Sequence, residues 1–267
     1  MTSRLEGEVV VITGGTGTLG AAIARAVADE GGAVVVLGRS GARGRAVAES
    51  IEASGGVASA VVADVVDEDA LDAACREVVD RHGRVTGLVN CAGGHVEGAT
   101  IDDDGDPLAL PMSSLRASLE LNVIGTVLPC QVFGKAMQGE GRIVNFSSMS
   151  ARRALTRVPA YAAAKAAIDN YTRVLAVEMA RRHGDRFRVN AVAPGFILAD
   201  TNRALLEDER GEPTERARAI VAKTPVGRFG RPDEIPGVVV WLLSKESSFV
   251  TGTIIPVDGG FDAFSGV

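Results

Sequence analysis

Seven short apolar runs recur along the chain, and they constrain its fold more than any other feature. Each run is rich in β-branched residues and is at most seven residues long. Runs that are this short and apolar on both faces are typical of strands buried inside a parallel sheet. The predicted strands are residues 8–13, 34–37, 59–63, 86–90, 142–147, 187–193 and 253–258.

Segments with the apolar spacing of helices separate these runs. The predicted helices are residues 18–30, 41–54, 67–82, 113–137, 160–182 and 232–244. Strands that alternate with helices in this way predict an α/β fold. We expect residues 1–267 to form a single Rossmann-type doubly wound domain, with a seven-stranded parallel sheet and helices on both faces.

Residues 196–231 form the longest departure from this alternation. The segment is charged and holds two short stretches with helical spacing. Long excursions of this kind often cover a binding site. We therefore predict a substrate lid here, with a plain surface excursion as the alternative.

Charge and hydropathy exclude several classes of function. The net charge is −6 and the sequence pI is about 5.2, which argues against non-specific binding to nucleic acid. No apolar run approaches the ~20 residues of a membrane span or the core of a signal peptide. We expect a cytoplasmic protein whose partner is a small molecule rather than nucleic acid or a membrane.

The cysteines and histidines do not predict a metal site. Cys75, Cys91 and Cys130 are widely spaced and contain no CxxC pair, and the three histidines form no cluster. An odd number of scattered cysteines also predicts no disulfide framework and suits a reducing compartment.

A glycine-rich turn follows the first predicted strand and leads directly into a helix. The stretch Thr13–Gly20 reads TGGTGTLG. Glycines allow a tight turn and a close approach of backbone N–H groups to a pyrophosphate, while the helix N-terminus supplies positive potential. The predicted ligands of a dinucleotide at this turn are Gly14, Thr16, Gly17, Thr18 and Leu19.

The end of the second strand bears on which dinucleotide is bound. An acidic residue there would bind the adenosine ribose hydroxyls and repel a 2′-phosphate. This chain instead carries Arg39 and Ser40, and a guanidinium pairs well with phosphate. The sequence favours NADP(H) as cofactor. If Arg39 is only a solvated loop residue, NAD(H) is the alternative.

One of the two tyrosines in the chain, Tyr161, lies one helical turn before Lys165. A ketone that accepts hydride develops negative charge on its oxygen and needs a nearby proton donor. Because a lysine ammonium on the same helix face favours a phenolate, we expect Lys165 to lower the pKa of Tyr161. Tyr161 is the predicted acid and base.

These features and several others occur in the order that characterises one family. They are the glycine-rich turn, Asp64-Val65, Asn90-Cys91-Ala92-Gly93, Asn122, Ser148, the Tyr161 to Lys165 spacing, Pro194-Gly195 and Val257-Asp258-Gly259-Gly260. Over essentially its whole length the chain resembles the short-chain dehydrogenase/reductase family. The resemblance implies that Ser148 holds the substrate oxygen and that Asn122 supports a water that relays protons to Lys165.

The resemblance also extends the predicted cofactor site beyond the first turn, and it implies that Lys165 binds the nicotinamide ribose. The additional residues are Asp64, Val65, Asn90, Ala92, Gly93, Tyr161, Lys165, Pro194, Gly195 and Ile197. It further implies a homotetramer, or a homodimer, formed through helices 113–137 and 160–182 and the C-terminal strand region.

Stretches such as RVPAYAAAKAAI, TPVGRFGRPDE and IPVDGGFDAFSGV are similar to the D-mannonate oxidoreductase (fructuronate reductase) branch of that family. This resemblance implies hydride transfer between the secondary alcohol of a sugar acid and its ketone. The residues expected to contact the substrate are His95, Ser150, Arg157, Asn202 and Arg203.

A sugar acid would need a cation for its carboxylate, because guanidinium binds carboxylate through two parallel hydrogen bonds. The candidates are Arg152, Arg153, Arg157 and Arg203, with Arg203 the first among them. For any single one of them, a solvated loop arginine is the favoured alternative. A 3-oxoacyl thioester is the alternative substrate. A non-catalytic dinucleotide-sensing protein is the alternative in a different class, since fold does not fix function.

Overall fold

A computed structural model describes residues 3–102, 104–199, 206, 208 and 211–266. Its centre is a seven-stranded sheet with the order β3-β2-β1-β4-β5-β6-β7, and every neighbouring pair is parallel. All seven predicted strands are confirmed. Their bounds are β1 Val9–Thr13, β2 Ala33–Gly38, β3 Val57–Val62, β4 Gly87–Asn90, β5 Gly141–Phe146, β6 Phe187–Pro194 and β7 Ile254–Val257.

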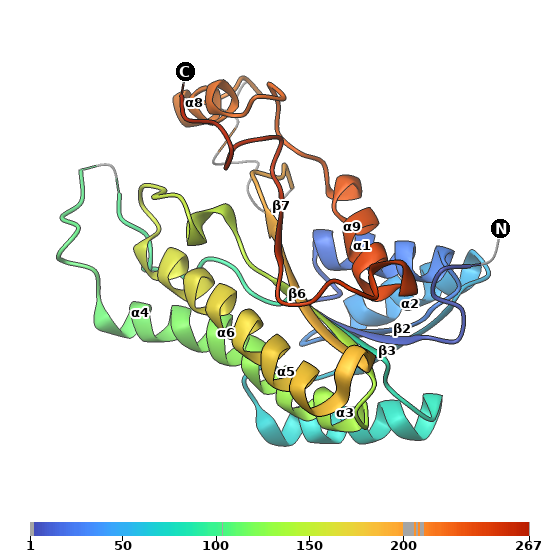
Figure 1. The fold of residues 1–267 in the computed structure, drawn as a ribbon. Coiled ribbons are helices and arrows are strands. Elements are labelled where there is room, and N and C mark those ends of the chain that lie inside the picture. The colour runs from blue at the N-terminus through green and yellow to red at the C-terminus, as the bar shows by residue number, and fades with distance from the viewer. Residues whose placement is uncertain (1–2, 103, 200–205, 207, 209–210, 267) are drawn as a thin grey trace.

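Helices cover both faces of this sheet (Figure 1). One core lies between the sheet and α1 Thr18–Asp29, α2 Gly41–Ala53 and α9 Pro236–Leu243. The other lies between the sheet and α3 Glu68–His82, α5 Gly125–Ala136 and α6 Pro159–His183. Side chains alternate between the two cores along β1, where Val9 and Val11 face one and Val10 and Ile12 the other.

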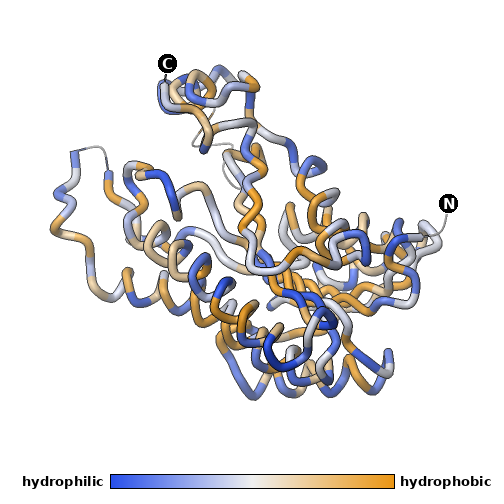
Figure 2. Tube along the Cα trace, viewed as in Figure 1, coloured by the Kyte–Doolittle hydropathy of each residue, from blue (hydrophilic) through white to orange (hydrophobic). Residues whose placement is uncertain are grey.

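The hydropathy of the chain follows this layering. Figure 2 shows the central strands as apolar, whereas hydrophilic residues recur along the outer helices. The doubly wound parallel sheet predicted from the sequence is therefore confirmed. No helix in the described ranges is both long and apolar enough to cross a bilayer.

The helix predicted over residues 113–137 contains a local irregularity. It consists of α4 Met112–Leu119, a π-helical turn over Glu120–Ile124 and then α5, without a break in right-handed helical backbone. Such π turns widen a helix by one residue and are frequent at functional sites. Asn122, one of the predicted site residues, lies inside this turn and is fully buried.

The segment after β6 builds a small unit above the end of the sheet. Its helix, α8 Glu215–Lys223, is capped by the Thr214 side chain. Leu206, Ala217 and Ile220 form a separate apolar cluster against which Phe196, Leu198 and Phe229 pack. Figure 1 places α8 beside the C-terminal end of the chain, above the carboxyl ends of the strands. Residues 200–205, 207 and 209–210 of the predicted lid lie outside the described residues.

Candidate active site

A cavity of about 430 Å³ opens at the carboxyl ends of the central strands. Loops after β1, β4, β5 and β6 meet there, on both sides of the point where the strand order reverses between β1 and β4. Ligands of doubly wound sheets bind in this position. The lining includes Gly14, Gly17, Thr18, Leu19, Gly93, His95, Ser148, Ser150, Tyr161, Pro194, Gly195 and Ile197, all of them predicted site residues.

The glycine-rich turn forms one wall of the cavity and meets the requirements of a pyrophosphate site. Gly14 has a φ of +64°, and a Cβ there would lie 2.7 Å from the Ala92 nitrogen. Gly17 precedes α1 and offers no side-chain cap to its first turn. In the described part of the chain, the amide groups at the start of α1 therefore have no side-chain cap, which suits a phosphate.

Tyr161 and Lys165 project from the first turns of α6. The Lys165 Nζ lies 5.4 Å from the centre of the Tyr161 ring and donates a hydrogen bond of 2.8 Å to the Phe146 carbonyl at the end of β5. Tyr161 remains partly exposed, whereas Lys165 is 3% exposed. The Ser148 side chain hydrogen-bonds with Tyr161 and accepts from the Ser150 backbone N–H at 3.2 Å.

The electrostatics of this pair correct one prediction. Burial raises the pKa of Tyr161 to about 12, and the hydrogen bond with Ser148 opposes this only in part. Burial also lowers the pKa of Lys165 to about 8, although the acidic groups of Cys91 and Asp169 act in the opposite direction. The pKa of Tyr161 is therefore raised, not lowered as predicted, because loss of hydration outweighs the hydrogen bond with Ser148.

Asn122 holds the backbone opposite Lys165. Its Oδ1 accepts from the Gly94 N–H at 3.0 Å, and its Nδ2 donates to the Gly94 and Ser118 carbonyls at 2.9 and 3.0 Å. A Cβ on Gly93 would lie 2.8 Å from the Asn122 Oδ1 and 3.4 Å from the Lys165 Nζ. The π turn therefore brings Asn122 to the same turn that Lys165 contacts.

The other predicted cofactor residues lie away from the cavity lining. The Arg39 side chain is 79% exposed and its NH1 lies 3.9 Å from an Asp64 carboxylate oxygen. Ser40 caps α2 through the Arg43 N–H, and Thr16 contacts the region of Gly38.

Val65 is a core residue. The Asn90 Nδ2 donates to the Asn145 Oδ1 at 2.9 Å, and the Ala92 N–H donates to the Thr13 hydroxyl at 3.2 Å.

Two of the predicted substrate contacts lie in the cavity. The His95 and Tyr161 rings are 4.6 Å apart between centroids. Ser150 is 5% exposed, and its hydroxyl finds no hydrogen-bond partner among the described residues. Arg157 does not line the cavity: its Nε donates to the Ile101 carbonyl at 3.0 Å, and its NH2 lies 3.6 Å from Asp102. Asn202 and Arg203 fall outside the described residues.

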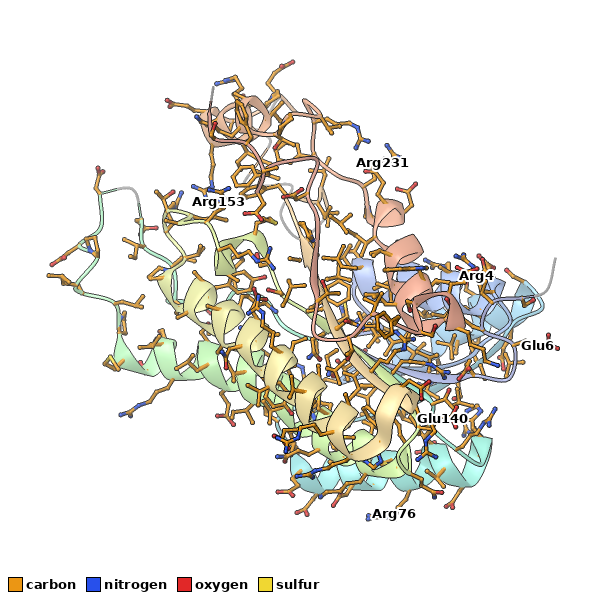
Figure 3. The ribbon with its side chains drawn as sticks, in the orientation of Figure 1. Arg4, Glu6, Arg76, Glu140, Arg153 and Arg231 are labelled. Carbon is orange, nitrogen blue, oxygen red and sulfur yellow. The ribbon has the colours of Figure 1, made fainter. Side chains whose placement is uncertain are left out.

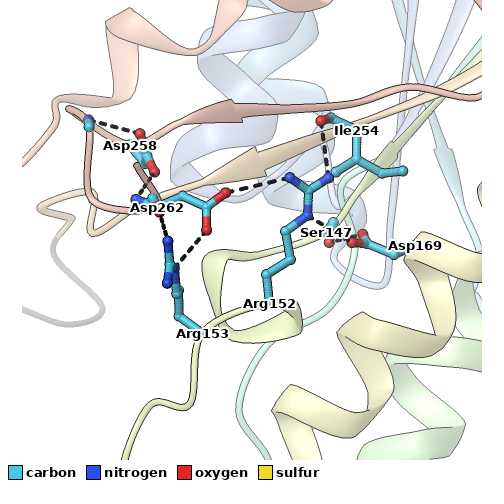
Figure 4. Close-up of polar contacts among 8 residues, drawn as sticks. Ser147, Arg152, Arg153, Asp169, Ile254, Asp258 and Asp262 are labelled. Atoms are coloured by element: carbon cyan, nitrogen blue, oxygen red, sulfur yellow. Dashed lines mark hydrogen bonds and ion pairs between the residues drawn. The ribbon is translucent and has the colours of Figure 1, made fainter. Parts of the chain in front are cut away.

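Arg152 and Arg153 take part in a partly exposed network of ion pairs and hydrogen bonds (Figure 4). Arg152 lies 3.5 Å from both Asp169 and Asp262, and Arg153 lies 2.9 Å from Asp262. Asp169 also accepts a short hydrogen bond from the Ser147 hydroxyl. Figure 3 shows Arg153 near the C-terminal end of the chain. These two arginines tie that end to α6 and the serine loop, so their donors are directed at protein carboxylates.

One cation in the cavity was not predicted. Arg216, the second residue of α8, lines the cavity together with Cys91, Met149, Leu155, Val158 and Phe196. It lies in the charged sequence Glu-Arg-Ala-Arg, where no motif distinguishes it from its neighbour Arg218. Only the packing of α8 over the strand ends brings it to the site.

Comparison with known proteins agrees with this geometry. A family model described as enoyl-(acyl carrier protein) reductase matches residues 15–262. The uncharacterized oxidoreductase UxuB of Bacillus subtilis is 42% identical over 99% of this chain and 98% of its own. The chain belongs to the short-chain dehydrogenase/reductase family. This dehydrogenase/reductase is thus an NAD(P)-dependent oxidoreductase. The family membership favours an enzyme over the alternative of a non-catalytic dinucleotide-sensing protein.

Relatives of this short-chain dehydrogenase/reductase carry several names. The 3-oxoacyl-[acyl-carrier-protein] reductase FabG of Thermotoga maritima is 34% identical, with 96% of this chain and 98% of FabG covered. A crystal structure from Haemophilus influenzae, provisionally named a D-mannonate oxidoreductase and containing NAD, has a TM-score of 0.94 at 38% identity, with 99% and 98% covered. A gluconate 5-dehydrogenase of Burkholderia cenocepacia, in complex with NADP and tartrate, has a TM-score of 0.86 at 29% identity, with 98% of each covered.

The residues of this short-chain dehydrogenase/reductase fit a nicotinamide dinucleotide. The glycine wall and the start of α1 would hold the pyrophosphate, and the nicotinamide end would lie toward Tyr161 and Lys165. The dinucleotide, when bound, supplies or accepts a hydride. Among the described residues, no group of histidine, cysteine and acidic side chains could hold a metal ion.

Proposed function

We propose that this enzyme interconverts a secondary alcohol and a ketone by hydride transfer on a sugar acid such as D-mannonate and D-fructuronate. The observation that carries the proposal is the polar end of the cavity. The Ser150 hydroxyl is buried there without a hydrogen-bond partner among the described residues, beside Ser148, His95 and Tyr161. A buried hydroxyl without a partner is costly unless a ligand satisfies it, and a polyhydroxylated substrate would do so.

Tyr161 is the group that exchanges a proton with the substrate oxygen. Its pKa of about 12 lies far above neutral pH, so the phenol holds a proton that it can donate as the substrate oxygen becomes negative. Ser148 holds the same oxygen from the other side. Asn122 fixes the turn next to Lys165, and its proposed support of a proton-relaying water stays a prediction.

We propose NADP(H) as the preferred cofactor, with NAD(H) as the alternative. Arg39 and Ser40 follow the second strand, where a 2′-phosphate would lie. The remaining predicted cofactor residues retain their proposed roles. The neighbours support a nicotinamide dinucleotide of either kind, since one contains NAD and the other NADP.

The alternative function is reduction of a 3-oxoacyl thioester, which the relation to FabG supports. A screen of cofactor oxidation and reduction against D-mannonate, D-fructuronate and 3-oxoacyl thioesters separates the two functions. We expect the sugar acids to be turned over. Activity confined to the thioesters would contradict the proposal.

The remaining proposals concern organisation. We propose that residues 1–267 act as one domain in which 196–231 form the substrate lid. We also propose a homotetramer or homodimer through α4, α5, α6 and the C-terminal strand region. Exposed apolar side chains on α4 and α6 (Met112, Val174 and Val177) and on the π-helical turn before α5 (Ile124) suit a covered surface. The three free cysteines suit the reducing cytoplasm.

A further inference from the structure

We infer that Arg216 binds the substrate's carboxylate and thereby selects acids over neutral polyols. This inference rests on the proposed function and extends it to a residue that neither the motifs nor the relatives single out. Three observations carry it: the composition of the cavity lining, the presence of Arg216 in the same lining as His95 and Tyr161, and the contacts of its guanidinium.

Arg216 is the one arginine, lysine, aspartate or glutamate among the described residues that line the cavity. The rest of that lining consists of glycines, hydroxyl-bearing side chains, apolar side chains, one cysteine and one histidine. A single cation in a pocket without an acid creates a positive potential that no neighbouring carboxylate cancels. A negatively charged ligand is the complement of such a pocket.

The position of Arg216 relative to the reacting groups can be traced through His95. The His95 ring contacts the Tyr161 ring in a tilted arrangement, with 4.6 Å between the ring centroids. Partial burial, then the positive charge of Arg216 and then that of Lys165 lower the pKa of His95. The charges of both Arg216 and Lys165 therefore act on His95. A substrate whose reacting carbon lies at Tyr161 would pass His95 and reach Arg216 with its far end.

The guanidinium of Arg216 keeps most of its donors available. Its NH1 donates to the Thr156 hydroxyl at 3.3 Å, and no carboxylate in the described part of the chain forms an ion pair with it. A guanidinium has five N–H donors, so a bidentate pair with a carboxylate remains geometrically open. By contrast, Arg152, Arg153 and Arg157 all contact carboxylates of the protein.

The surroundings of Arg216 also favour an anion. Arg216 lies in the first turn of α8, where the helix dipole disfavours a cation. Glu215 in the same turn is exposed and forms no ion pair with it among the described residues. A bound carboxylate would offset the positive potential of both the guanidinium and the helix start. The buried Ser150 hydroxyl would bind a hydroxyl of the same substrate.

The test compares D-mannonate with its neutral amide, D-mannonamide, in the full-length enzyme. Arg216→Ala should lower kcat/KM for D-mannonate by roughly tenfold or more, as expected for loss of a charge-assisted bond, and for the amide by less than about twofold. Arg216→Lys should be intermediate, because it keeps the charge and loses the planar fork. Arg218→Ala, an exposed arginine on the same helix outside the cavity lining, should change neither substrate.

The affinity for the reduced cofactor, measured by fluorescence, should be the same in the wild type and the three variants. This control shows that the variants are folded. Equal losses for acid and amide, or no loss for the acid, would overturn the assignment of Arg216. If the wild type oxidises neither compound, the sugar-acid function fails. Arg216 is then tested by measuring the reduction of any neutral ketone that the enzyme accepts, with D-gluconate or tartrate added as inhibitor. These acids should inhibit the wild type and should not inhibit Arg216→Ala. Absence of inhibition in the wild type would overturn the inference as well.

Discussion

The two ends of the cavity are built in different ways. Around Tyr161 and Lys165, helix α6 packs against the ends of the central strands, and Lys165 is bound to a strand carbonyl in nearly complete burial. Around Arg216, a short helix outside the sheet carries a partly exposed guanidinium that donates a hydrogen bond to the Thr156 hydroxyl.

This difference determines what each end can do. Buried groups interact strongly and change each other's pKa. A substitution among them therefore affects the reaction of every substrate. A partly exposed arginine acts mainly on the group it directly contacts, because solvent screens it from the rest. The buried end is suited to chemistry, and the exposed end to selectivity.

The strongest way to break this comparison is to remove the Tyr161 hydroxyl. Tyr161→Phe keeps the ring on His95 and removes the exchangeable proton, so kcat should fall by roughly 10²-fold or more for charged and neutral substrates alike. Cofactor binding, measured by fluorescence titration, should be nearly unchanged. A normal turnover rate, or a loss limited to acids, would remove Tyr161 from the chemistry.

A second test concerns the buried charge of Lys165. Burial lowers its pKa from 10.5 to about 8. Below pH 8 the folded and unfolded states are both protonated, and the buried charge destabilises the fold. Between pH 8 and 10.5 the folded state has released a proton that the unfolded state still holds, so this contribution to stability rises with pH. Above pH 10.5 the destabilisation is gone.

Comparison with Lys165→Met isolates this contribution from other titrating groups. We expect the free energy of unfolding of the wild type to rise relative to the variant, by up to about 1.4 kcal/mol per pH unit between pH 8 and 10.5. Urea unfolding of both proteins at several pH values measures the difference. A difference that does not vary with pH would show that Lys165 is hydrated rather than buried.

A third test concerns Arg39, an exposed residue at the outer edge of the proposed cofactor site. Its side chain is 79% exposed, and its long contact with Asp64 leaves it free to meet a phosphate. Arg39→Ala should weaken NADP(H) binding by about 1.5–3 kcal/mol and leave NAD(H) binding almost unchanged. Titration calorimetry with both cofactors measures this. Equal losses, or a wild-type preference for NAD(H), would contradict the prediction.

Arg152 tests whether an arginine near the cavity can be purely structural. Arg152→Ala removes a partner of the buried Asp169 carboxylate and should destabilise the protein by about 1–2 kcal/mol in urea unfolding. The ratio of kcat/KM for D-mannonate and its amide should not change. Arg231→Ala, which removes two exposed ion pairs, with Asp233 and Glu234, is the control and should be neutral within about 0.5 kcal/mol. A changed substrate ratio would place Arg152 in the site.

The sequence alone determined the sheet and the chemical end of the cavity. Apolar runs of strand length recur because both faces of a parallel sheet are buried, and the glycine turn and the spacing of Tyr161 and Lys165 depend on neighbours close in the chain. Such local patterns can be recognised without knowing which distant segments meet.

Only the tertiary structure decided the electrostatics and the choice among the arginines. The pKa of Tyr161 depends on how much protein surrounds the phenol, which spacing along α6 does not reveal. Arg152, Arg153 and Arg157 proved to be bound to protein carboxylates, while Arg216, without any distinguishing motif, lies in the cavity. An arginine's role depends on which carboxylates fold against it, and that is decided by contacts between residues far apart in the chain.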